Sequence, residues 1–231
     1  MEPMPERLPI TLILPAFNEA RIIEQVIRDI RQVGNFRIVV IDDGSTDGTA
    51  AKVLAMGEQV VRHPLNRGAG AACQTGISLA RKYGWPYLAF MDSDGQHFPE
   101  DLEGLITTMQ AQQADLVIGS RFAGTQNQIP YLRRFFNTAA NILTNSFCTH
   151  HYTDTQSGFR LLNQRAIAAL DLLQDDFSYC SEMIILAERA KLKVAETPIR
   201  VRYTDYSVSK GQDFQVGLLT AFHFLWKLIF K

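Results

Sequence analysis

The sequence predicts an α/β protein with a mostly parallel sheet flanked by helices, and three observations predict it. Short apolar runs alternate along the first half with stretches in which apolar residues recur at helical spacing. The composition is globular, with 46% hydrophobic and 20% charged residues among 231. Four of the apolar runs are followed by polar or charged residues. Such an alternation builds βαβ units, and their sheets bind ligands outside the carboxyl ends of the strands.

Composition also limits the kind of partner. The net charge is −1, so the chain has no global positive charge for binding nucleic acid. The three cysteines stand apart without metal-ligand spacing, which indicates a reduced, cytosolic-type compartment. The N-terminus lacks a signal-peptide pattern. No apolar run reaches the roughly 20 residues that a membrane-spanning helix needs.

The first two strands are predicted at 10–14 and 37–41, and Pro15 ends the first of them. Between them a helix opens at Asn18–Glu19 and ends at Gly34–Asn35. Its apolar residues share one face: Ile22, Ile23, Val26, Ile27 and Ile30. After the second strand, Ser45 or Thr46 is expected to cap a helix that runs to Met56.

The same alternation continues to about residue 120. Further strands are predicted at 59–62, 87–91 and 115–118, with helices at 71–83 and about 99–111. Four strand ends therefore carry polar side chains toward one edge of the sheet: Asn18/Glu19, Asp42/Asp43, Asp92/Asp94 and Ser120/Arg121.

The second half is less regular. A helix is predicted at 129–148, and the arginines and aromatic residues near its start suit either a membrane surface or a plain amphipathic helix. A helix at 179–190 and an extended stretch at 194–203 follow. The tail, 214–231, is strongly apolar. It predicts a helix at a membrane interface, on a partner subunit or on the protein's own core.

The acidic stretch Asp92-Ser93-Asp94 is the centre of the predicted site. Two carboxylates at the end of a buried strand are costly unless something pairs with them. A divalent metal that shares a diphosphate is one such partner, and an ordinary acidic loop with a helix cap is the alternative. The convergence of four polar strand ends favours the metal–diphosphate interpretation.

Two familiar phosphate-binding motifs are missing from the sequence. The turn after the first strand has no GxGxxG, and no GxxxxGK[ST] occurs anywhere. Phosphate charge would then be met by the metal and by basic side chains. The candidates are Arg67, Arg121, Arg160, Arg202 and Lys210.

Taken together, the motifs resemble those of family 2 glycosyltransferases with a GT-A fold. More narrowly, they are similar to the polyprenyl-phosphate sugar transferases of the dolichol-phosphate mannosyltransferase type. The matching segments cover nearly the whole chain in the family's order: Leu-Pro-Ala-Phe-Asn-Glu (14–19), Ile-Asp-Asp-Gly-Ser-Thr-Asp-Gly-Thr (41–49), Asn-Arg-Gly-Ala-Gly (66–70), Met-Asp-Ser-Asp-Gly-Gln-His (91–97), Gly-Ser-Arg-Phe (119–122), Ser-Gly-Phe-Arg (157–160) and Ser-Lys (209–210).

The resemblance implies roles for individual residues. Pro15, Phe17 and Glu19 would line the nucleotide pocket, and Ile41, Asp42 and Asp43 would hold the base and ribose. Asp92, Ser93 and Asp94 form the family's DXD element. Asp94 and Gln96 would hold Mg²⁺ or Mn²⁺ on the donor diphosphate, with Asp92 on ribose or metal. Arg121, Arg202 and Lys210 would meet donor phosphates, and Arg160 an acceptor phosphate. The longer spacing from Arg202 to Lys210 departs from the mannosyltransferase pattern.

The expected chemistry is an inverting, single-displacement transfer. The leaving diphosphate gains negative charge, so a metal and arginines that hold it more strongly in the transition state lower the barrier, with Asp94, Arg121 and Arg160 as the catalytic group. A phosphate acceptor is already an anion and needs no general base. For a hydroxyl acceptor, Asp154 and Glu182 are the candidate bases, although a turn cap and a first-turn carboxylate explain them equally well.

The predicted function is therefore metal-dependent transfer of a sugar from a nucleotide-sugar, of the GDP-mannose or UDP-glucose type, to a polyprenyl or dolichyl phosphate. The expected location is the cytoplasmic membrane face, with peripheral contact or a membrane partner through the tail. A saccharide or other hydroxyl acceptor is one alternative, and a non-catalytic nucleotide-sugar-binding subunit is another. One catalytic domain is expected at 1–212, divided into a donor half (1–122) and an acceptor half (123–212), with an apolar helix at 213–231.

Overall fold

A seven-stranded sheet forms the centre of the molecule, and the computed structural model describes residues 8–124, 127 and 129–203. The order across the sheet is β3-β2-β1-β4-β6-β5-β7. The strands are β1 (Ile10–Ala16), β2 (Arg37–Asp42), β3 (Gln59–Arg62), β4 (Tyr87–Phe90), β5 (Leu116–Ser120), β6 (Arg160–Asn163) and β7 (Val194–Pro198). This confirms the α/β class with a mostly parallel sheet.

Seven α-helices and one short 3-10 helix are present in the described part of the chain. They are α1 (Ile23–Val33), α2 (Thr49–Ala55), α3 (Ala69–Tyr83), η1 (Pro99–Asp101), α4 (Leu102–Gln112), α5 (Tyr131–Asn145), α6 (Gln164–Ala169) and α7 (Tyr179–Arg189). None of these helices has the length and apolar character needed to cross a bilayer. The predicted tail helix at 213–231 lies outside the described residues.

One strand departs from the parallel arrangement. β6 lies between β4 and β5 and runs antiparallel to both, while the other described strand pairs are parallel. Its register places Arg160 opposite Phe90 and Ile118. A segment of the second half of the chain therefore enters the middle of the sheet, directly beside the strand that ends in the acidic stretch.

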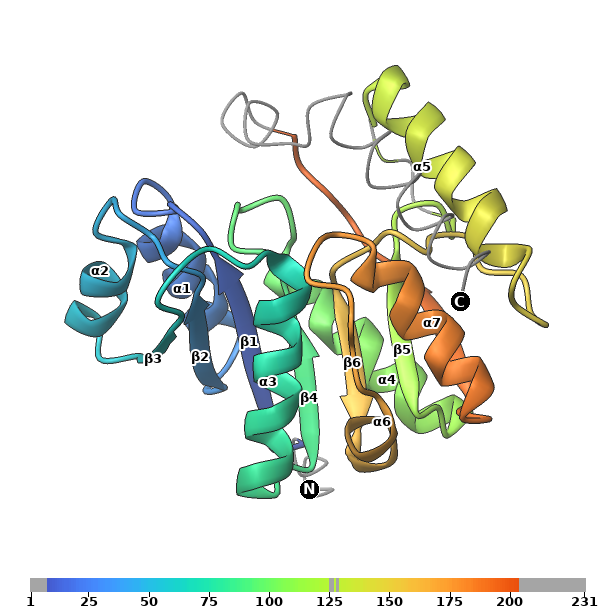
Figure 1. Ribbon diagram of the computed structural model, residues 1–231, viewed down its shortest axis with the longest axis horizontal. Coiled ribbons are helices and arrows are strands. Elements are labelled where there is room, and N and C mark those ends of the chain that lie inside the picture. Colours follow the sequence, from blue (N-terminus) through green and yellow to red (C-terminus); the bar gives the residue numbers. More distant parts are fainter. Residues whose placement is uncertain (1–7, 125–126, 128, 204–231) are drawn as a thin grey trace, which may run out of the picture.

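Two apolar layers cover the sheet, because successive strand residues point to opposite faces. Ile13, Val39 and Ile41 pack with residues of α3 and α7 on one face. Leu12, Leu14 and Val40 pack with residues of α1 and α4 on the other. Figure 1 shows α3, α6 and α7 in front of the sheet, α1 and α4 behind it, and α5 standing off at the upper right. The core fixes the strands, so the loops at their carboxyl ends are held close together.

Candidate active site

Three of the predicted strand ends meet directly at the carboxyl edge. β1 pairs with β2 up to the register Ala16 with Asp42, and with β4 up to Ile13 with Phe90. Beyond β4, the Ser93 hydroxyl donates a hydrogen bond to the Pro15 carbonyl at 2.6 Å. Ser93 is buried, so it fixes the acidic stretch against the end of β1 and leaves the neighbouring carboxylates as the exposed groups.

The loop after β1 is held by the loop after β2. Asn18 has a left-handed φ of 54°, its N–H donates to the Ser45 hydroxyl and its side-chain oxygen accepts from the Thr46 N–H. The Glu19 N–H donates to the Thr49 hydroxyl at 2.8 Å. Glu19 is buried and Phe17 is 43% exposed, so of these two residues Phe17 offers a surface to a ligand.

The expected capping of the helix after β2 is wrong. α2 begins at Thr49 behind Gly48, which makes no side-chain cap, and Ser45 and Thr46 instead bind Asn18. Asp47 is the residue that accepts the Thr49 N–H, at 3.0 Å. Ser45 and Thr46 do not cap α2 because they lie too far ahead of its first turn, where the backbone N–H groups without an intrahelical partner are.

The two carboxylates after β2 have different surroundings. Asp43 is buried and accepts from the His63 ring and from the backbone N–H groups of Arg67 and Gly68. Asp42 Oδ1 accepts the Ser45 N–H, while Asp42 Oδ2 forms an ion pair with Arg62 Nε at 3.2 Å and accepts no hydrogen bond from the described residues. The neighbouring Ile41 is fully buried in the core, so its side chain faces α3 rather than a ligand surface.

The acidic pair beyond β4 is organised by its own loop. Asp94 accepts from the backbone N–H of Gln96 at 2.9 Å and from the Gln96 side-chain amide. Asp92 Oδ2 lies 3.0 Å from His97 Nε2, and the Asp92 side chain is 44% exposed. His97 is buried and packs on Phe159, so it supports Asp92 from behind rather than facing a ligand.

The two carboxylates have pKa values shifted in opposite directions. Burial and the negative charge of Asp92 raise the pKa of Asp94. Burial also opposes the ionised form of Asp92, but the hydrogen bond and charge of His97, with the charges of Arg121 and Arg160, outweigh it and lower the pKa of Asp92. The ionised form of Asp94 is therefore disfavoured beside Asp92, and a bound cation would relieve the repulsion between the two carboxylates.

The residues of this loop fit a divalent cation. Two carboxylates and an amide oxygen are the hard oxygen donors that Mg²⁺ and Mn²⁺ take, and such ions usually complete their coordination with phosphate oxygens and water. Among the described residues, no group of three or more His, Cys, Asp and Glu side chains could hold a metal by itself. A metal on Asp92, Asp94 and Gln96 would therefore complete its coordination with oxygens of a bound diphosphate.

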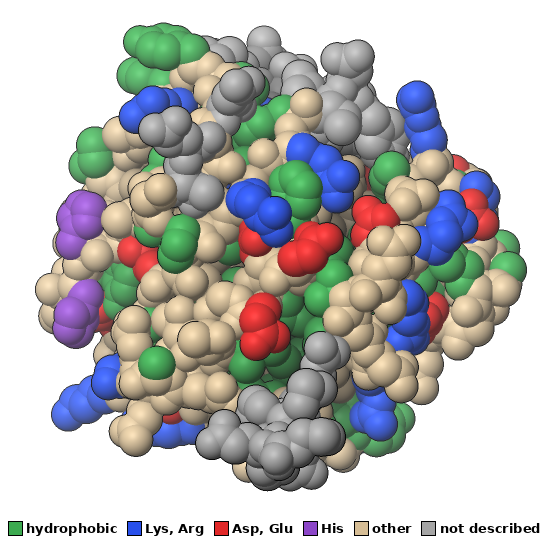
Figure 2. All heavy atoms as spheres, turned by 180° about the vertical axis from the view of Figure 1, so that it is seen from behind, with side chains coloured by type: hydrophobic (Ala, Val, Ile, Leu, Met, Phe, Trp, Pro, Cys, Tyr) green, Lys and Arg blue, Asp and Glu red, His purple; other side chains and the backbone are tan. Residues whose placement is uncertain are grey.

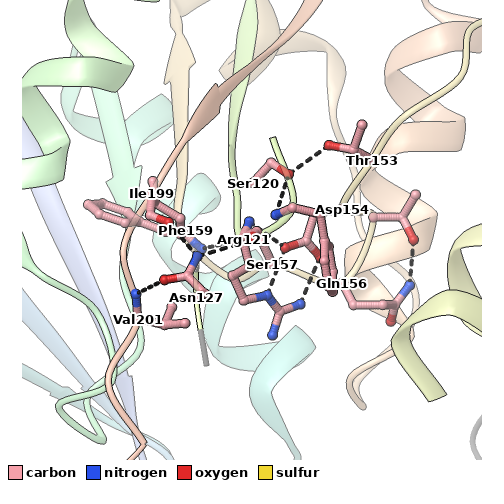
Figure 3. A network of polar contacts seen from close by, with 12 residues as sticks. Ser120, Arg121, Asn127, Thr153, Asp154, Gln156, Ser157, Phe159, Ile199 and Val201 are labelled. Atoms are coloured by element: carbon pink, nitrogen blue, oxygen red, sulfur yellow. Dashed lines mark hydrogen bonds and ion pairs between the residues drawn. The ribbon is translucent and has the colours of Figure 1, made fainter. Parts of the chain in front are cut away.

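Arg121 is fixed by a buried carboxylate. Asp154 accepts from Arg121 Nε and Nη2 at 2.7 Å each, and from the Arg121 backbone N–H at 2.9 Å (Figure 3). Asp154 is fully buried and the Arg121 side chain is 14% exposed. Burial lowers the pKa of Arg121, but the charge and hydrogen bonds of Asp154 outweigh it and raise the pKa. The guanidinium is held as a permanent, oriented cation.

Arg160 is fully buried. Its Nε donates to the Ser157 carbonyl at 2.9 Å and its Nη2 to the Thr155 carbonyl at 3.0 Å, whereas Nη1 has no partner among the described residues. The turn it braces presses on the acidic pair, since a Cβ on Gly158 would lie 2.5 Å from Asp92 Oδ1. Arg160 therefore lies behind the site and acts on it through charge and through this turn.

The segment after β7 crosses the acidic loop. His97 and Val201 form an isolated antiparallel bridge, and the Arg202 N–H donates to the Gln96 carbonyl at 2.9 Å. The Arg202 guanidinium stacks on Phe98 and pairs with Asp29 at 3.5 Å. In Figure 2, basic and acidic side chains lie side by side near the middle of the face opposite to that of Figure 1. The structure thus attaches Arg202 to α1 and the acidic loop, while Lys210 lies outside the described residues.

Both candidate bases have structural partners. Asp154 is occupied by Arg121, and its own backbone N–H donates to Glu196 at 3.0 Å. Glu182, in the first turn of α7, accepts the backbone N–H groups of Leu173 and Gln174. Glu182 is thus the first-turn carboxylate that the sequence allowed, whereas Asp154 is the ion-pair partner of Arg121 and not a turn cap.

Three residues of the site were not predicted. They are His63, which binds Asp43; Asn127, whose amide joins Arg121 to Ile199 and Val201 (Figure 3); and Gly158, which packs on Asp92. Each has a partner at least 20 positions away, and although Gly158 lies in the matching segment Ser-Gly-Phe-Arg, nothing local indicated its contact with Asp92. For His63 a signal existed, because it directly follows a strand at the edge where the other polar strand ends meet.

The site thus gathers an acidic pair, a fixed arginine and further carboxylates at the carboxyl edge of the sheet. Residues 11–170 match the model of glycosyl transferase family 2, and the chain belongs to this family. The prediction of a hexosyltransferase of this family is confirmed.

Known relatives extend over almost the whole chain. An uncharacterized protein of Methanocaldococcus jannaschii is 37% identical, over 96% of this chain and 91% of its own. The polyprenol monophosphomannose synthase of Mycolicibacterium smegmatis is 32% identical over 86% and 79%. The UDP-N-acetylglucosamine–dolichyl-phosphate N-acetylglucosaminyltransferase of Methanococcus voltae is 29% identical over 90% and 91%. These relatives include the branch that the motifs resemble.

Solved structures share the fold. Glucosyl-3-phosphoglycerate synthase from Mycobacterium tuberculosis, crystallised with Mn²⁺, uridine diphosphate and phosphoglyceric acid, superposes with a TM-score of 0.67 at 20% identity. The match covers 92% of this chain and 78% of that one. The GT-A architecture predicted from the motifs is therefore confirmed.

Proposed function

We propose that this glycosyltransferase moves a hexose from a nucleotide-sugar, of the GDP-mannose or UDP-glucose type, to a polyprenyl or dolichyl phosphate, with inversion and with a divalent metal. The observation that carries the proposal is the pairing of an acidic centre, Asp92 and Asp94, with the oriented cation Arg121, whose charge acts on Asp92. The carboxylates would bind the metal cation, and the guanidinium would bind the anionic leaving group, so the reaction needs both kinds of charge.

The names of two relatives support the acceptor class. The Methanococcus voltae protein is named for a dolichyl phosphate and the Mycolicibacterium smegmatis protein for a polyprenol monophosphate. Both match this chain over at least 86% of its length. The sugars in these two names differ, N-acetylglucosamine in one and mannose in the other, so the names do not choose between the GDP-mannose and UDP-glucose types of donor.

The state of the candidate bases supports a phosphate acceptor. A hydroxyl acceptor needs a carboxylate that can take its proton, and general bases act within hydrogen-bond reach of that proton. Asp154 is sealed against Arg121, and Glu182 holds the 173–174 backbone. A phosphate oxygen attacks as an anion, so it requires only positioning.

The division of labour at the site follows from these contacts. Asp94 and Gln96, with Asp92, would hold the metal, which would supply positive charge against the departing diphosphate. Arg121 binds phosphate oxygens with the guanidinium N–H groups that Asp154 does not accept. This interaction strengthens as negative charge accumulates on the leaving diphosphate. Phe17 would border the nucleotide pocket, and the buried side chains of Glu19, Asp42 and Asp43 would shape it from behind. In this scheme Arg160 supports Asp92 from behind, because it is fully buried.

The outward face of α5 supports a peripheral position at a membrane. The inner side of this helix is polar: Asn141 binds the backbone around Thr153 and Thr155, and Asn145 binds that of Tyr152. Tyr131, Phe135 and Ile142 point outward instead, with Tyr131 at 86% exposure. Such a reversed amphipathic helix suits the lipid interface where a polyprenyl chain is anchored. We place this interface at the cytoplasmic face.

The experiment is a transfer assay on the purified full chain. A thermal-shift screen of UDP- and GDP-sugars with Mn²⁺ identifies the donor, because a ligand of the native state raises its stability. The labelled donor is then offered to a polyprenyl phosphate in detergent and, separately, to soluble saccharides. We expect Mn²⁺- or Mg²⁺-dependent, EDTA-sensitive labelling of the lipid phosphate alone.

Asp94→Asn is the decisive variant. It removes one negative charge and a metal ligand while keeping the shape of the side chain, so we expect a loss of transfer of at least about 100-fold with an unchanged unfolding midpoint. Glu103→Gln on the exposed face of α4 is the matched control. A fully active Asp94→Asn variant overturns the metal assignment. Labelling of saccharides alone overturns the acceptor class, and donor binding without any turnover identifies a non-catalytic subunit.

A further inference from the structure

A buried chain of polar contacts connects α3 to the carboxylates after β2. His63 directly follows β3, is buried, and its ring lies between two side chains from other elements. Nδ1 is 2.6 Å from Asp43 Oδ1, and Nε2 is 2.8 Å from the Thr75 hydroxyl of α3. Because an ionised carboxylate only accepts, Nδ1 is the donor to Asp43.

Asp43 in turn holds the loop after β3. Its Oδ2 accepts the Gly68 N–H at 2.7 Å, and both oxygens accept the Arg67 N–H at 3.1 Å. Gly44, directly after Asp43, has a φ of +75°, and a Cβ there would lie 2.6 Å from the Asn66 nitrogen. The loops after β2 and β3 are therefore pressed together, with one carboxylate as the clamp.

The loop that Asp43 holds, 66–68, and the start of α3 also contact the 174–175 segment in the second half of the chain. Arg67 pairs with Asp175 at 3.2 Å, and the Gly70 N–H donates to the Asp175 carbonyl at 2.8 Å. A Cβ on Gly70 would overlap the Gln174 carbonyl oxygen, so the two segments have no slack between them. A rotation of the Asp43 carboxylate would therefore shift the loop that borders the proposed donor pocket.

We propose that His63 is a positioning residue for donor binding, which acts through Asp43 on the 66–68 loop. It does not touch the substrate. It fixes the rotamer of Asp43, and Asp43 fixes the 66–68 loop beside the carboxyl end of β2, where the nucleotide would bind under the proposed function. This inference rests on the proposed function, since the ligand it positions is the nucleotide-sugar donor.

Two conservative variants separate the two bonds of the imidazole. In His63→Asn the amide nitrogen stands near the place of Nδ1 and keeps the bond to Asp43. In His63→Gln the amide nitrogen stands near the place of Nε2 and keeps the bond to Thr75. Thr75→Val removes the Nε2 partner and leaves the Asp43 bond. We therefore expect His63→Asn and Thr75→Val to behave alike, and His63→Gln to differ from both.

The first readout is amide hydrogen exchange at Arg67 and Gly68 in the ligand-free protein. We expect exchange at least about 10-fold faster in His63→Gln, and near wild type in His63→Asn and Thr75→Val. The second readout is the KM–kcat split with the donor found in the screen. We expect KM to rise about 10-fold in His63→Gln while kcat changes less than about 3-fold.

The possible failures are distinguishable. Equal exchange in His63→Asn and His63→Gln overturns the clamp, whatever the substrate is. Faster exchange in His63→Gln with an unchanged donor KM overturns the link to donor binding. A wild-type protein that binds no nucleotide-sugar overturns the proposed function, and the exchange experiment still decides whether His63 controls the loop.

Discussion

The buried ion pair of Arg121 and Asp154 is a close, two-pronged contact near the site. The carboxylate is fully buried and takes both Nε and Nη2 of the guanidinium at 2.7 Å. A buried pair of this geometry is worth little over an apolar pair of the same size, but removing one partner leaves an uncompensated charge. The pair therefore fixes the orientation of the Arg121 cation and makes the protein sensitive to substitution of either partner.

Asp154→Asn should lower both stability and activity. It leaves Arg121 buried with a neutral partner, and we expect a loss of about 3 kcal/mol in the free energy of unfolding. The freed guanidinium no longer points at the donor phosphates, so kcat should fall by at least about 10-fold. Urea unfolding and steady-state kinetics measure the two effects.

Asp171→Asn is the matched control for this substitution. Asp171 pairs with Arg81 at 2.6 Å but is 71% exposed, and such surface pairs contribute less than about 1 kcal/mol. To separate orientation from base catalysis, Arg121→Gln and the double variant complete a cycle. Orientation predicts that the double variant is no slower than Arg121→Gln alone. If the loss of kcat in the double variant equals the product of the losses in the two single variants, Asp154 has an independent role in the reaction.

At the scale of single residues, the sequence predicts which residues lie at the site better than it predicts which partners they contact. Asp92, Asp94 and Asp42 could be predicted because each follows an apolar strand, and parallel strands end at one edge. The partner of Arg121 could not, because Asp154 is 33 positions away in a stretch without periodicity. Asp43 shows the same limit, since its neighbour Asp42 has the same local pattern and quite different partners.

At the scale of elements, the alternation of strands and helices predicts the first half well. β1 to β5 and the helices between them lie close to where hydrophobic periodicity places them, except that α1 begins at Ile23 and not at Asn18–Glu19, whose backbone N–H groups bind Ser45 and Thr49 in a turn. β6 was not predicted, because its four residues follow a polar turn and give no period of their own. Its antiparallel position between β4 and β5 is set by the core, into which Leu161 and Leu162 are packed.

The link between α7 and the loop after α5 should depend on pH. Glu188, near the end of α7, accepts from Thr149, His150 and the Tyr152 hydroxyl. Burial opposes its ionised form, but these hydrogen bonds outweigh burial and lower the pKa of Glu188 to about 2. A lowered carboxyl pKa adds stability that is present above the ordinary value of 4.5 and is lost as the pH falls toward 2.

Glu188→Gln should remove that contribution. We expect the wild type to exceed the variant by on the order of 2 kcal/mol at pH 7, with the gap closing between pH 4.5 and about 2. Urea unfolding at a series of pH values measures it. Glu103→Gln, an exposed carboxylate of α4, should give a curve parallel to wild type. A Glu188→Gln gap that stays constant down to about pH 2.5 would contradict the assignment.

At the scale of the whole molecule, the residues proposed to bind the donor lie at the carboxyl edge of the sheet, and α5 lies outside the sheet. The proposed donor half, 1–122, contributes β1 to β5, and the proposed acceptor half, 123–212, contributes β6, β7 and α5. The sequence left α5 open between a membrane surface and a solvated amphipathic helix, because hydropathy alone does not say which face turns inward. The structure turns the amides inward, toward the 152–155 backbone.

The outward face of α5 therefore carries the last prediction. Tyr131, Phe135 and Ile142 lie at helical spacing and are 86%, 61% and 68% exposed, and Arg134 beside them is also exposed. Burying apolar side chains in a lipid interface is favourable by roughly 1 kcal/mol or more each, and arginine adds attraction to anionic lipid. The combined change to Gln at all three apolar positions should lower binding to vesicles of anionic lipid with polyprenyl phosphate at least about 10-fold.

Exposed apolar residues elsewhere provide the control for that experiment. Leu54 of α2 and Tyr83 of α3 are each 60% exposed, so Leu54→Gln with Tyr83→Gln removes comparable apolar surface from other elements. Co-sedimentation should be unchanged in this control, and both variants should keep the wild-type rate toward a short, detergent-soluble polyprenyl phosphate. If the α5 variant binds vesicles like wild type, the acceptor must reach the site without this helix at the bilayer. If it loses activity toward the short acceptor as well, α5 acts on the site itself, since its amides hold the backbone that carries Asp154.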